Sequence, residues 1–534
     1  MICMSLRKQA VFFFLAVFLC VGTLLRLYKS NEHFMFSWDQ AMNMYVWQDM
    51  HDAIKTGEYS RLPIRGEPGE SPDQEALIYH GSFYLYFMLP IAIATHFNPS
   101  GIVQILSVLN ALGILLMYVA GRMFFDKRTG LIAAFFYAVS FWMVAYGNEI
   151  WTPTLQPLFV LISLVGLAGV LYKKEGYWPL LGFGAAAVSQ VHSSGYLFFF
   201  FLLFCIVLYR IRPKTWQMLL GTLVATILPM SPTLYYEATN GFHLPFIVQQ
   251  AFVTQLMKTA GEWTFNGAVR EVFERFIGTV LVSMGVAASS LLLSWPQYLL
   301  AGLLILVGGW TLIRLLSGIF VWRKKLQLPH KIFLWFLFLF LPIPWVAQVY
   351  YHRGAGLSEW ILTRMFFAVP ILFLVAAHCI HRMLFVSRWR VIATIAVCAY
   401  FFVNFSLIYT LGGLHDASIF DYTEKKAIAE YIARDAGSTP FTLVYPQGQH
   451  SWFELLYFFD EQHSLLPERI NGKTQISFWW VTKMLRNEPS ALQYLLLPSD
   501  DVRFTSKKNM RNSFSTPHFL IYRVEEIEIS ESID

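Results

Sequence analysis

The sequence predicts an all-α polytopic membrane protein with outer interfacial helices and a small C-terminal α/β domain outside the membrane. Three observations support this fold class. First, 56% of the 534 residues are hydrophobic and only 14% are charged, whereas about 25% of a soluble protein is charged. Second, 17% of the residues are aromatic, and Trp and Tyr collect at membrane interfaces. Third, Lys and Arg form short clusters between long apolar runs, which favours a membrane protein over a nucleic-acid-binding one.

An N-terminal apolar run, Val11 to Leu25, is interpreted as an uncleaved first span because no small-x-small cleavage site follows it. A helix needs roughly 20 apolar residues to cross the hydrocarbon. The run 176–209 would form a helix of about 50 Å, so we predict a hairpin that turns near residues 190–195. The charge-free runs occupy residues 102–121, 129–147, 154–172, 176–209, 215–235, 296–313, 332–351, 365–377 and 391–411.

Short loops rich in Lys and Arg mark the cytoplasmic side of a membrane protein. If the N-terminus and the loop 122–128 are both inside, an even number of spans separates them. The apolar stretches 82–97 and 270–294 then lie on the outer side, the first as an interfacial helix. We expect about eleven spans in the plasma or inner membrane, with the N-terminus in the cytoplasm and the C-terminus outside. The basic loops are Arg7-Lys8, 122–128, Lys173-Lys174, 210–214, 323–325 and 382–390.

The chain is expected to form two domains. Residues 1–411 make the transmembrane domain with a first outer loop at 28–101, and residues 412–534 make the extracytoplasmic α/β domain. The five cysteines lie in apolar runs or near the N-terminus, so a disulfide framework is not expected. Within the second domain, a helical pattern at 423–432 alternates with strand-like runs at 441–445, 494–497 and 519–524.

An acidic residue opens the first outer loop. Ser37 and Gln40 fit a capping box, so a helix should begin here and run to Ile54. Asp39 then lies in the first helical turn at the membrane surface. A carboxylate in that place can simply interact with the helix dipole, or it can act on a substrate.

Further polar residues are expected at the outer ends of spans. His80 precedes the interfacial helix, Glu149 follows the second long run, and His192 lies at the hairpin turn. Arg353 and Arg364 lie in the loop just before the apolar span at 365–377. Taken singly, each can be an interface residue or a helix anchor. What they share is more informative: all are expected at the outer ends of spans. A site at that depth of the membrane can bind the headgroup of a lipid in the outer leaflet.

Several motifs follow one another in a recognisable order. They are Asp39 at the start of an outer helix, His80-Gly81-Ser82-Phe83-Tyr84, Gly121-Arg122-Met123-Phe124-Phe125, Leu131-Ile132-Ala133-Ala134, Trp151-Thr152-Pro153 and Gln190-Val191-His192. This order resembles the polytopic GT-C glycosyltransferases of the protein O-mannosyltransferase and aminoarabinose transferase type, glycosyltransferase families 39 and 83. The resemblance covers roughly residues 10–210 well and the remainder loosely.

The resemblance implies an enzyme of cell-envelope glycan biosynthesis that takes a sugar from a polyprenyl-phosphate-linked donor. The acceptor would be a lipid, a glycan or a protein, and the reaction would invert the anomeric centre. Asp39 would be the catalytic residue, as a base or as the group that orients the acceptor. Substrate and donor-phosphate binding would fall to His80, Glu149, His192, Arg353 and Arg364.

A divalent metal ion is possible in such an enzyme. The only plausible carboxylate cluster for it is Asp39 with Glu67, Asp73 or Glu75. The sequence contains no Walker-type or dinucleotide fingerprint, in keeping with a lipid-linked donor, and no nucleic-acid partner is expected.

Two other functions compete with glycosyl transfer. A transporter or flippase for a lipid-linked substrate would tend to have internal repeats and helices broken at matching places in two halves, and the sequence lacks such symmetry. A non-catalytic assembly subunit would use its tail to bind partners.

Overall fold

The chain divides into two compact units in the computed structural model. The first unit comprises Met1–Tyr28 and Trp47–Thr410, and the second comprises Lys29–Val46 and Leu411–Asp534. Residues 29–46 thus group with the C-terminal unit, although the sequence-based domains keep them with the transmembrane part. The described residues are 2–28, 30, 34, 36, 38–66, 80–240, 328–340, 366–409, 422–436, 441–444, 492–498, 511–515 and 519–524.

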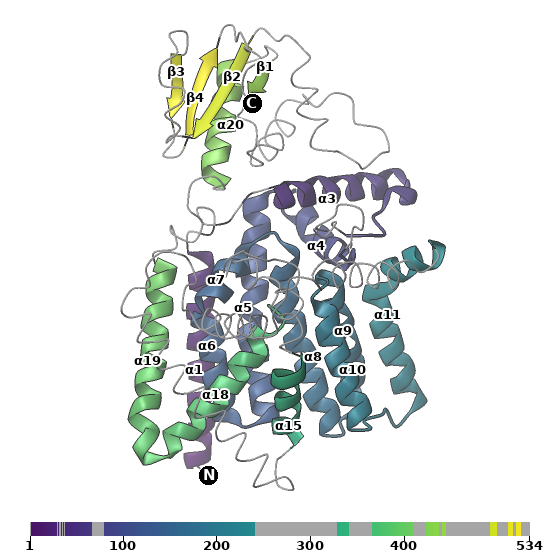
Figure 1. Cartoon of the computed structure of the whole chain (residues 1–534), viewed down its shortest axis with the longest axis vertical. Coiled ribbons are helices and arrows are strands. Elements are labelled where there is room, and N and C mark those ends of the chain that lie inside the picture. Colours follow the sequence, from purple (N-terminus) through teal and green to yellow (C-terminus); the bar gives the residue numbers. More distant parts are fainter. Residues whose placement is uncertain are drawn as a thin grey trace, which may run out of the picture. The chain divides into compact units, whose positions relative to one another are not determined.

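The first unit is built from apolar helices (Figure 1). Among the described residues, five helices are long and apolar enough to cross a membrane, or six if one bent pair counts as a single span. The protein is therefore membrane-embedded. The count of about eleven stays a prediction, since the runs at 296–313 and 341–351 lie outside the described residues, as does 270–294. The helices of this unit are α1 (Ile2–Leu27), α4 (Phe83–Ala94), α5 (Pro99–Phe124), α6 (Lys127–Val139), α7 (Phe141–Ala145), α8 (Gln156–Leu171), α9 (Trp178–Val191), α10 (Gly195–Leu208), α11 (Trp216–Thr239), α15 (Leu328–Trp335), α18 (Val369–Phe385) and α19 (Ser387–Tyr409).

Short helical pieces connect several of these elements. A 3₁₀ turn, η1, lies in the first outer loop, and α15 continues directly into a π-helix, η5. Two 3₁₀ turns, η2 and η3, link α7 to α8, and η4 links α8 to α9. Their bounds are η1 (Tyr59–Arg61), η2 (Tyr146–Asn148), η3 (Thr152–Leu155), η4 (Glu175–Tyr177) and η5 (Phe336–Phe340).

The lengths of the helices agree with two predictions from the sequence, for the runs 176–209 and 82–97. The run 176–209 is a hairpin, as predicted, because α9 ends at Val191 and α10 begins at Gly195. Helix α4 has 12 residues and is about 18 Å long, which is shorter than the roughly 30 Å of hydrocarbon. By itself α4 is too short to cross, in line with the interfacial helix expected at 82–97.

The run 129–147 departs from the prediction of one continuous span. Helix α6 ends at Val139, and the following helical stretch, Phe141–Asn148, is inclined to it by 60°. Ser140 causes the break by taking an extended conformation (ψ 121°), and its Oγ accepts a hydrogen bond from the amide of Met143. The span is therefore broken toward the end that is distant from the basic loop 122–128, where the second candidate acidic residue, Glu149, follows.

Four of the basic loops lie at one end of the first unit. They join α5 to α6, α8 to α9, α10 to α11, and α18 to α19, and the last two junctions are visible at the lower end of Figure 1. The chain leaves each of these loops toward the opposite end, in the case of α6 through the bent continuation Phe141–Asn148. His192, at the end of α9, and Glu149, beyond α7, therefore lie at the end opposite the basic loops, as the charge pattern predicts.

Helices α5 and α6 approach each other through a pair of glycines. A Cβ atom added to Gly121 would lie 2.7 Å from the Cα atom of Gly130, and one added to Gly130 would lie 2.6 Å from the carbonyl oxygen of Tyr118. Both obstacles are backbone atoms, which cannot rotate away. Small residues at such crossings let membrane helices pack closely.

Replacing Gly121 by Ala should therefore lower the free energy of unfolding by about 1–3 kcal/mol, because the methyl group forces the two helices apart. Thermal unfolding of the detergent-solubilised protein measures this as a lower midpoint temperature. Gly176→Ala is the matched control, since a Cβ there would meet no atom within 4 Å. Equal midpoints for the two variants would contradict the close crossing.

The second unit contains helix α20 (Tyr422–Ala436) and a four-stranded sheet of order β1-β2-β4-β3. Strands β1 and β2 pair in parallel, and the other two pairs are antiparallel, with an irregularity between Asn512 and Phe514. The helix and three strands coincide with the runs found in the sequence. Strand β3 had no sequence signal. The strands are β1 (Phe441–Val444), β2 (Leu492–Pro498), β3 (Arg511–Ser515) and β4 (Phe519–Val524).

Candidate functional site

Two of the predicted site residues, far apart in the sequence, are in contact. The imidazole rings of His80 and His192 stack with their centroids 4.6 Å apart and their planes at 30°. His80 comes just before α4, and His192 follows α9 at the hairpin turn. The backbone amide of Ser193 donates to Nδ1 of His80 at 3.3 Å. The end of the bundle opposite the basic loops thus carries a histidine pair.

The hydrogen bonds of the pair determine where its protons lie. Nδ1 of His80 accepts from Ser193, and Nδ1 of His192 accepts from the amide of Ser194 at 3.2 Å. A neutral imidazole that accepts at Nδ1 carries its proton on Nε2. Both rings are therefore Nε2–H donors, which suits the recognition of an anionic or oxygen-rich group.

A buried glutamine holds the second ring of the pair. Nε2 of Gln156 donates to Oγ of Ser194 at 3.1 Å, and that hydroxyl lies 2.8 Å from Nδ1 of His192. Gln156 is fully buried and begins α8. Since the hydroxyl accepts from Gln156, it can donate its proton to His192, so this chain of contacts orients the imidazole.

The loop before α4 can reach the hairpin only because it contains a glycine. A Cβ on Gly81 would lie 2.1 Å from Oε1 and 2.7 Å from the backbone oxygen of Gln190. The Gln190 amide is itself fixed, because Nε2 donates to the hydroxyl of Tyr196 at 3.0 Å and Oε1 accepts from Thr233 at 2.7 Å. The histidine pair therefore rests on a network that joins α9, α10 and α11.

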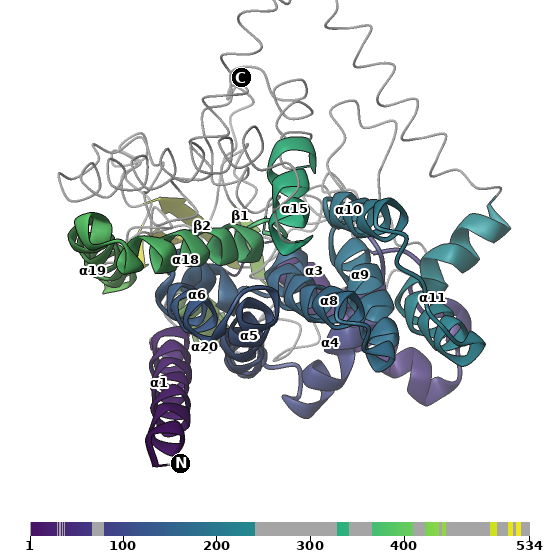
Figure 2. The ribbon, with the colours of Figure 1, turned by 90° about the horizontal axis from the view of Figure 1, so that it is seen from below.

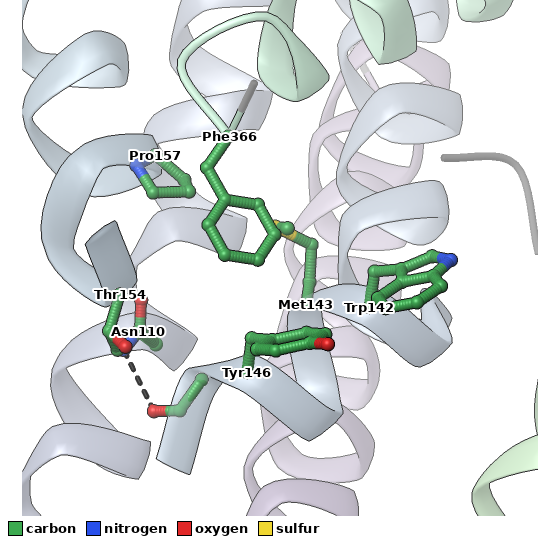
Figure 3. Close-up of a pocket in the computed structure, with 8 residues that line it drawn as sticks. Asn110, Trp142, Met143, Tyr146, Thr154, Pro157 and Phe366 are labelled. Atoms are coloured by element: carbon green, nitrogen blue, oxygen red, sulfur yellow. Dashed lines mark hydrogen bonds between the residues drawn. The ribbon is translucent and has the colours of Figure 1, made fainter. Parts of the chain in front are cut away.

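Glu149 lies between η2 and η3, beyond the break in the second long run. It is 1% exposed, and its neighbour Asn148 is 4% exposed. A small pocket lies beside this segment. Figure 3 shows the pocket between Phe366 and Tyr146, with Asn110 bonded to the Gly147 carbonyl at one side. Its full lining is Asn110, Trp142, Met143, Tyr146, Gly147, Thr154, Pro157 and Phe366.

Several buried polar atoms surround that pocket. The hydroxyl of Thr154, the side-chain oxygen of Asn148 and the indole N–H of Trp142 have no hydrogen-bond partner among the described residues. Buried polar atoms in folded proteins nearly always have a partner. Buried polar atoms thus gather in the segment between α7 and α8, beside a small pocket whose walls are mainly apolar.

Arg61 and Arg65 both lie in the loop between residues 57 and 66, and their surroundings differ. Arg61 is bound by the carboxylates of Glu58 and Asp49, and these hydrogen bonds raise the pKa of the guanidinium. Arg65 lies 4.6 Å from the ring of Tyr236 and donates to its hydroxyl at 3.1 Å. Arg65 therefore packs against the ring of Tyr236, at the end of α11. Arg353 and Arg364 lie outside the described residues.

Asp39 belongs to the second unit. It lies in the first turn of α3 (Trp38–Thr56), and the helix begins where the capping pattern predicts. Its side chain is partly exposed. The three other carboxylates proposed for a metal, Glu67, Asp73 and Glu75, fall outside the described residues, so the metal cluster stays a prediction. No group of three or more metal-ligating side chains occurs in the part of the chain that the structure describes.

The segment just before Asp39 is attached to α20. The ring of Tyr422 packs 4.7 Å from that of Phe34 and 5.5 Å from that of Phe36. Nζ of the fully buried Lys425 donates to the carbonyl of Phe36 at 2.8 Å. Helix α20 therefore holds the chain by packing and a hydrogen bond at Phe36, three residues before Asp39.

Sequence reasoning missed several residues that build this region. Arg26 directly follows the first apolar run, where an arginine is typical of a helix anchor. Asn110 and Asn404 lie inside apolar runs, and such intramembrane polar residues are a recognised sign of function. Gln156 follows the Trp151-Thr152-Pro153 motif closely, but no sequence pattern indicates that its side chain orients His192 through Ser194.

Neither a protein-family model nor a curated protein matches the chain. Solved structures do match it, and they are GT-C fold glycosyltransferases of membranes. The oligosaccharyltransferase of Archaeoglobus fulgidus, tethered to an acceptor peptide, is 12% identical with a TM-score of 0.47 and matches over 84% of this chain and 63% of its own. The chain thus spans less than two thirds of that protein.

A second similar structure has nearly the same length as this chain. ArnT from Cupriavidus metallidurans, bound to undecaprenyl phosphate, is 12% identical with a TM-score of 0.43, over 97% of this chain and 98% of its own. At these TM-scores and identities the likeness carries no argument about substrates or residues.

Proposed function

We propose that the protein is an integral membrane glycosyltransferase that moves a sugar from a polyprenyl-phosphate donor to a hydroxyl or phosphate acceptor on the outer face. The observation that supports this best is the His80–His192 pair. It presents two Nε2–H donors at the end of the bundle opposite the basic loops. A lipid phosphate in the outer leaflet would lie at the height of such donors.

The proposed transfer is a displacement at the anomeric carbon of the sugar. The acceptor oxygen attacks the anomeric carbon of the sugar while the bond from that carbon to the phosphate oxygen breaks. Asp39 takes the acceptor proton or orients the acceptor hydroxyl, and the polyprenyl phosphate leaves with the bonding electrons. Direct displacement inverts the anomeric centre.

The leaving phosphate needs donors and cations directed at its oxygens. His80 and His192 supply two N–H groups, and Arg353 and Arg364 are proposed to supply charge. Glu149 is proposed to bind the sugar or acceptor hydroxyls, since a carboxylate accepts from several hydroxyl groups. Undecaprenyl phosphate, the ligand named in the ArnT structure, is of the class proposed here for the leaving group.

The transporter alternative has no specific observation in its favour. A broken span occurs at α6–α7, but a transporter of the inverted-repeat type would place a second broken helix in a corresponding half. The sequence contains no repeat that would supply it.

Mass spectrometry of membrane lipids and surface glycans tests the function in cells. Deleting the gene should remove one sugar modification and leave a sugar-loaded polyprenyl phosphate in excess. Restoring the wild-type gene should reverse both changes, and a gene that encodes Asp39→Asn should reverse neither. Unchanged lipid and glycan profiles on deletion would count against glycosyl transfer.

A further inference from the structure

A fully buried arginine lies close to the broken span. Arg26, near the end of α1, is 0% exposed. Its Nη1 donates to the carbonyls of Gly22 at 2.8 Å and Ala138 at 3.2 Å, and its Nη2 donates to the carbonyl of Tyr137 at 3.1 Å. Burial of a charge inside a membrane protein is expensive, and charged residues kept there usually serve function.

Two of those carbonyls are free to accept because α6 ends at Val139. The last four carbonyls of a helix have no partner in the helix, and its C-terminus carries a partial negative charge. Arg26 binds two of them with a positive charge. The hydroxyl of Tyr400 donates to a third, that of Phe136, at 3.0 Å. Together these side chains stabilise the end of α6 inside the membrane, where water cannot.

Hydrogen bonds also fix the segment that follows the break at Ser140. Oδ1 of Asn404 accepts from the amide of Phe141 at 2.8 Å, and Nδ2 of Asn110 donates to the carbonyl of Gly147 at 2.9 Å. A Cβ on Gly147 would lie 3.5 Å from Nε of Arg26, so the guanidinium lies alongside this residue too. Arg26 therefore holds the Ala138 end of the segment 138–147 by a hydrogen bond, and Asn110 holds the Gly147 end.

We propose that Arg26 is a positioning residue for the transfer reaction, acting through Glu149. By binding the carbonyls of Tyr137 and Ala138 where α6 ends, while Asn110 binds the carbonyl of Gly147, it fixes the course of the chain toward Glu149. This inference rests on the proposed function, in which Glu149 binds substrate. Asn110 and Asn404 complete the clamp from α5 and α19.

A double-mutant cycle separates positioning from a general loss of stability. Arg26→Gln should lower kcat/KM about 100-fold, because a displacement of about 1 Å at a reacting group costs that much. Arg26→Lys keeps the charge and should recover part of this loss. In a Glu149→Gln background, Arg26→Gln should add less than about threefold, since the residue that it positions no longer acts. Arg122→Gln, an exposed arginine of α5 at the basic end, is the control and should change the rate by less than about twofold.

A labelling experiment tests the clamp without any turnover. Glu149→Cys is introduced into a chain whose five natural cysteines are replaced by Ala, and a membrane-impermeant maleimide is added. Position 149 is 1% exposed, so labelling should be slow with Arg26 present. It should be at least about tenfold faster with Arg26→Gln and intermediate with Arg26→Lys. Thr239→Cys, an exposed position at the end of α11, should label equally in all three backgrounds.

The two measurements distinguish the possible failures. The positioning role would be overturned if kcat/KM of the double variant fell by the full product of the two single-variant losses. It would also be overturned if the cysteine at 149 were labelled equally slowly with and without Arg26. Labelling that responds to Arg26 in a protein that transfers no sugar would leave the clamp standing and overturn the proposed function instead.

Discussion

Replacing Asp39 by Asn should lower the rate of sugar transfer by about 10²–10⁴-fold, the range that a positioned general base contributes. The amide keeps the shape of the side chain but cannot take the acceptor proton. Asp39 lies in the first turn of α3, where a carboxylate also interacts favourably with the helix dipole by about 0.3–1 kcal/mol. The loss of that interaction is small, so the variant should still insert and fold. The measurement is kcat for transfer by purified protein, together with its thermal unfolding midpoint.

A second aspartate of the same helix provides the control. Asp52→Asn, further along α3, removes the same charge away from the first turn and should change kcat by less than about twofold. If Asp39→Asn and Asp52→Asn transferred sugar at the same rate, Asp39 would not be the base. A fall in the unfolding midpoint that accounts for the whole loss of activity would point to the helix-dipole role alone.

Replacing His192 by Phe should lower kcat about 10²–10³-fold, the cost of removing one preorganised donor to a developing negative charge. Phe can keep the stacking on His80 but supplies no N–H group. His192→Gln can place an amide N–H where Nε2–H was, so it should retain more activity. The rate of transfer, measured with the sugar-loaded lipid at saturation, distinguishes the two variants.

A double variant with His80 and a control variant at His96 extend this test. His80→Phe combined with His192→Phe should cost less than the product of the single losses, because the rings are in contact and are proposed to bind one phosphate. His96→Phe alters an exposed histidine just after α4 and should leave kcat within about twofold. Equal activities of His192→Phe and His96→Phe would refute the phosphate-binding role of the pair.

Much of the fold could be predicted because it depends on length and charge alone. A run as long as 176–209 cannot be one span, so the hairpin of α9 and α10 followed from helix geometry. The positions of the basic loops in the sequence predict that His192 and Glu149 lie at the same end of the bundle. The start of α3 followed from the local capping chemistry of Ser37 and Gln40.

Other features depend on contacts between distant parts of the chain. The run 129–147 contains neither Pro nor a charge, and its break at Ser140 is stabilised by Arg26, Tyr400 and Asn404 from other helices. Strand β3 was missed because its residues are mostly polar and are ordered by pairing with β4. No local pattern relates His80 to His192, since only the packing of the loop before α4 on the hairpin brings the rings together.

The most direct test of the account is transfer by the purified protein in vesicles that contain a polyprenyl-phosphate sugar. With the wild-type protein, radiolabelled sugar should move to an acceptor supplied on the outer side, with polyprenyl phosphate formed in equal amount and with inversion at the anomeric carbon. Asp39→Asn should yield neither product. Movement of the intact sugar-loaded lipid between leaflets, without cleavage of its bond to phosphate, would instead establish the flippase alternative and contradict the account.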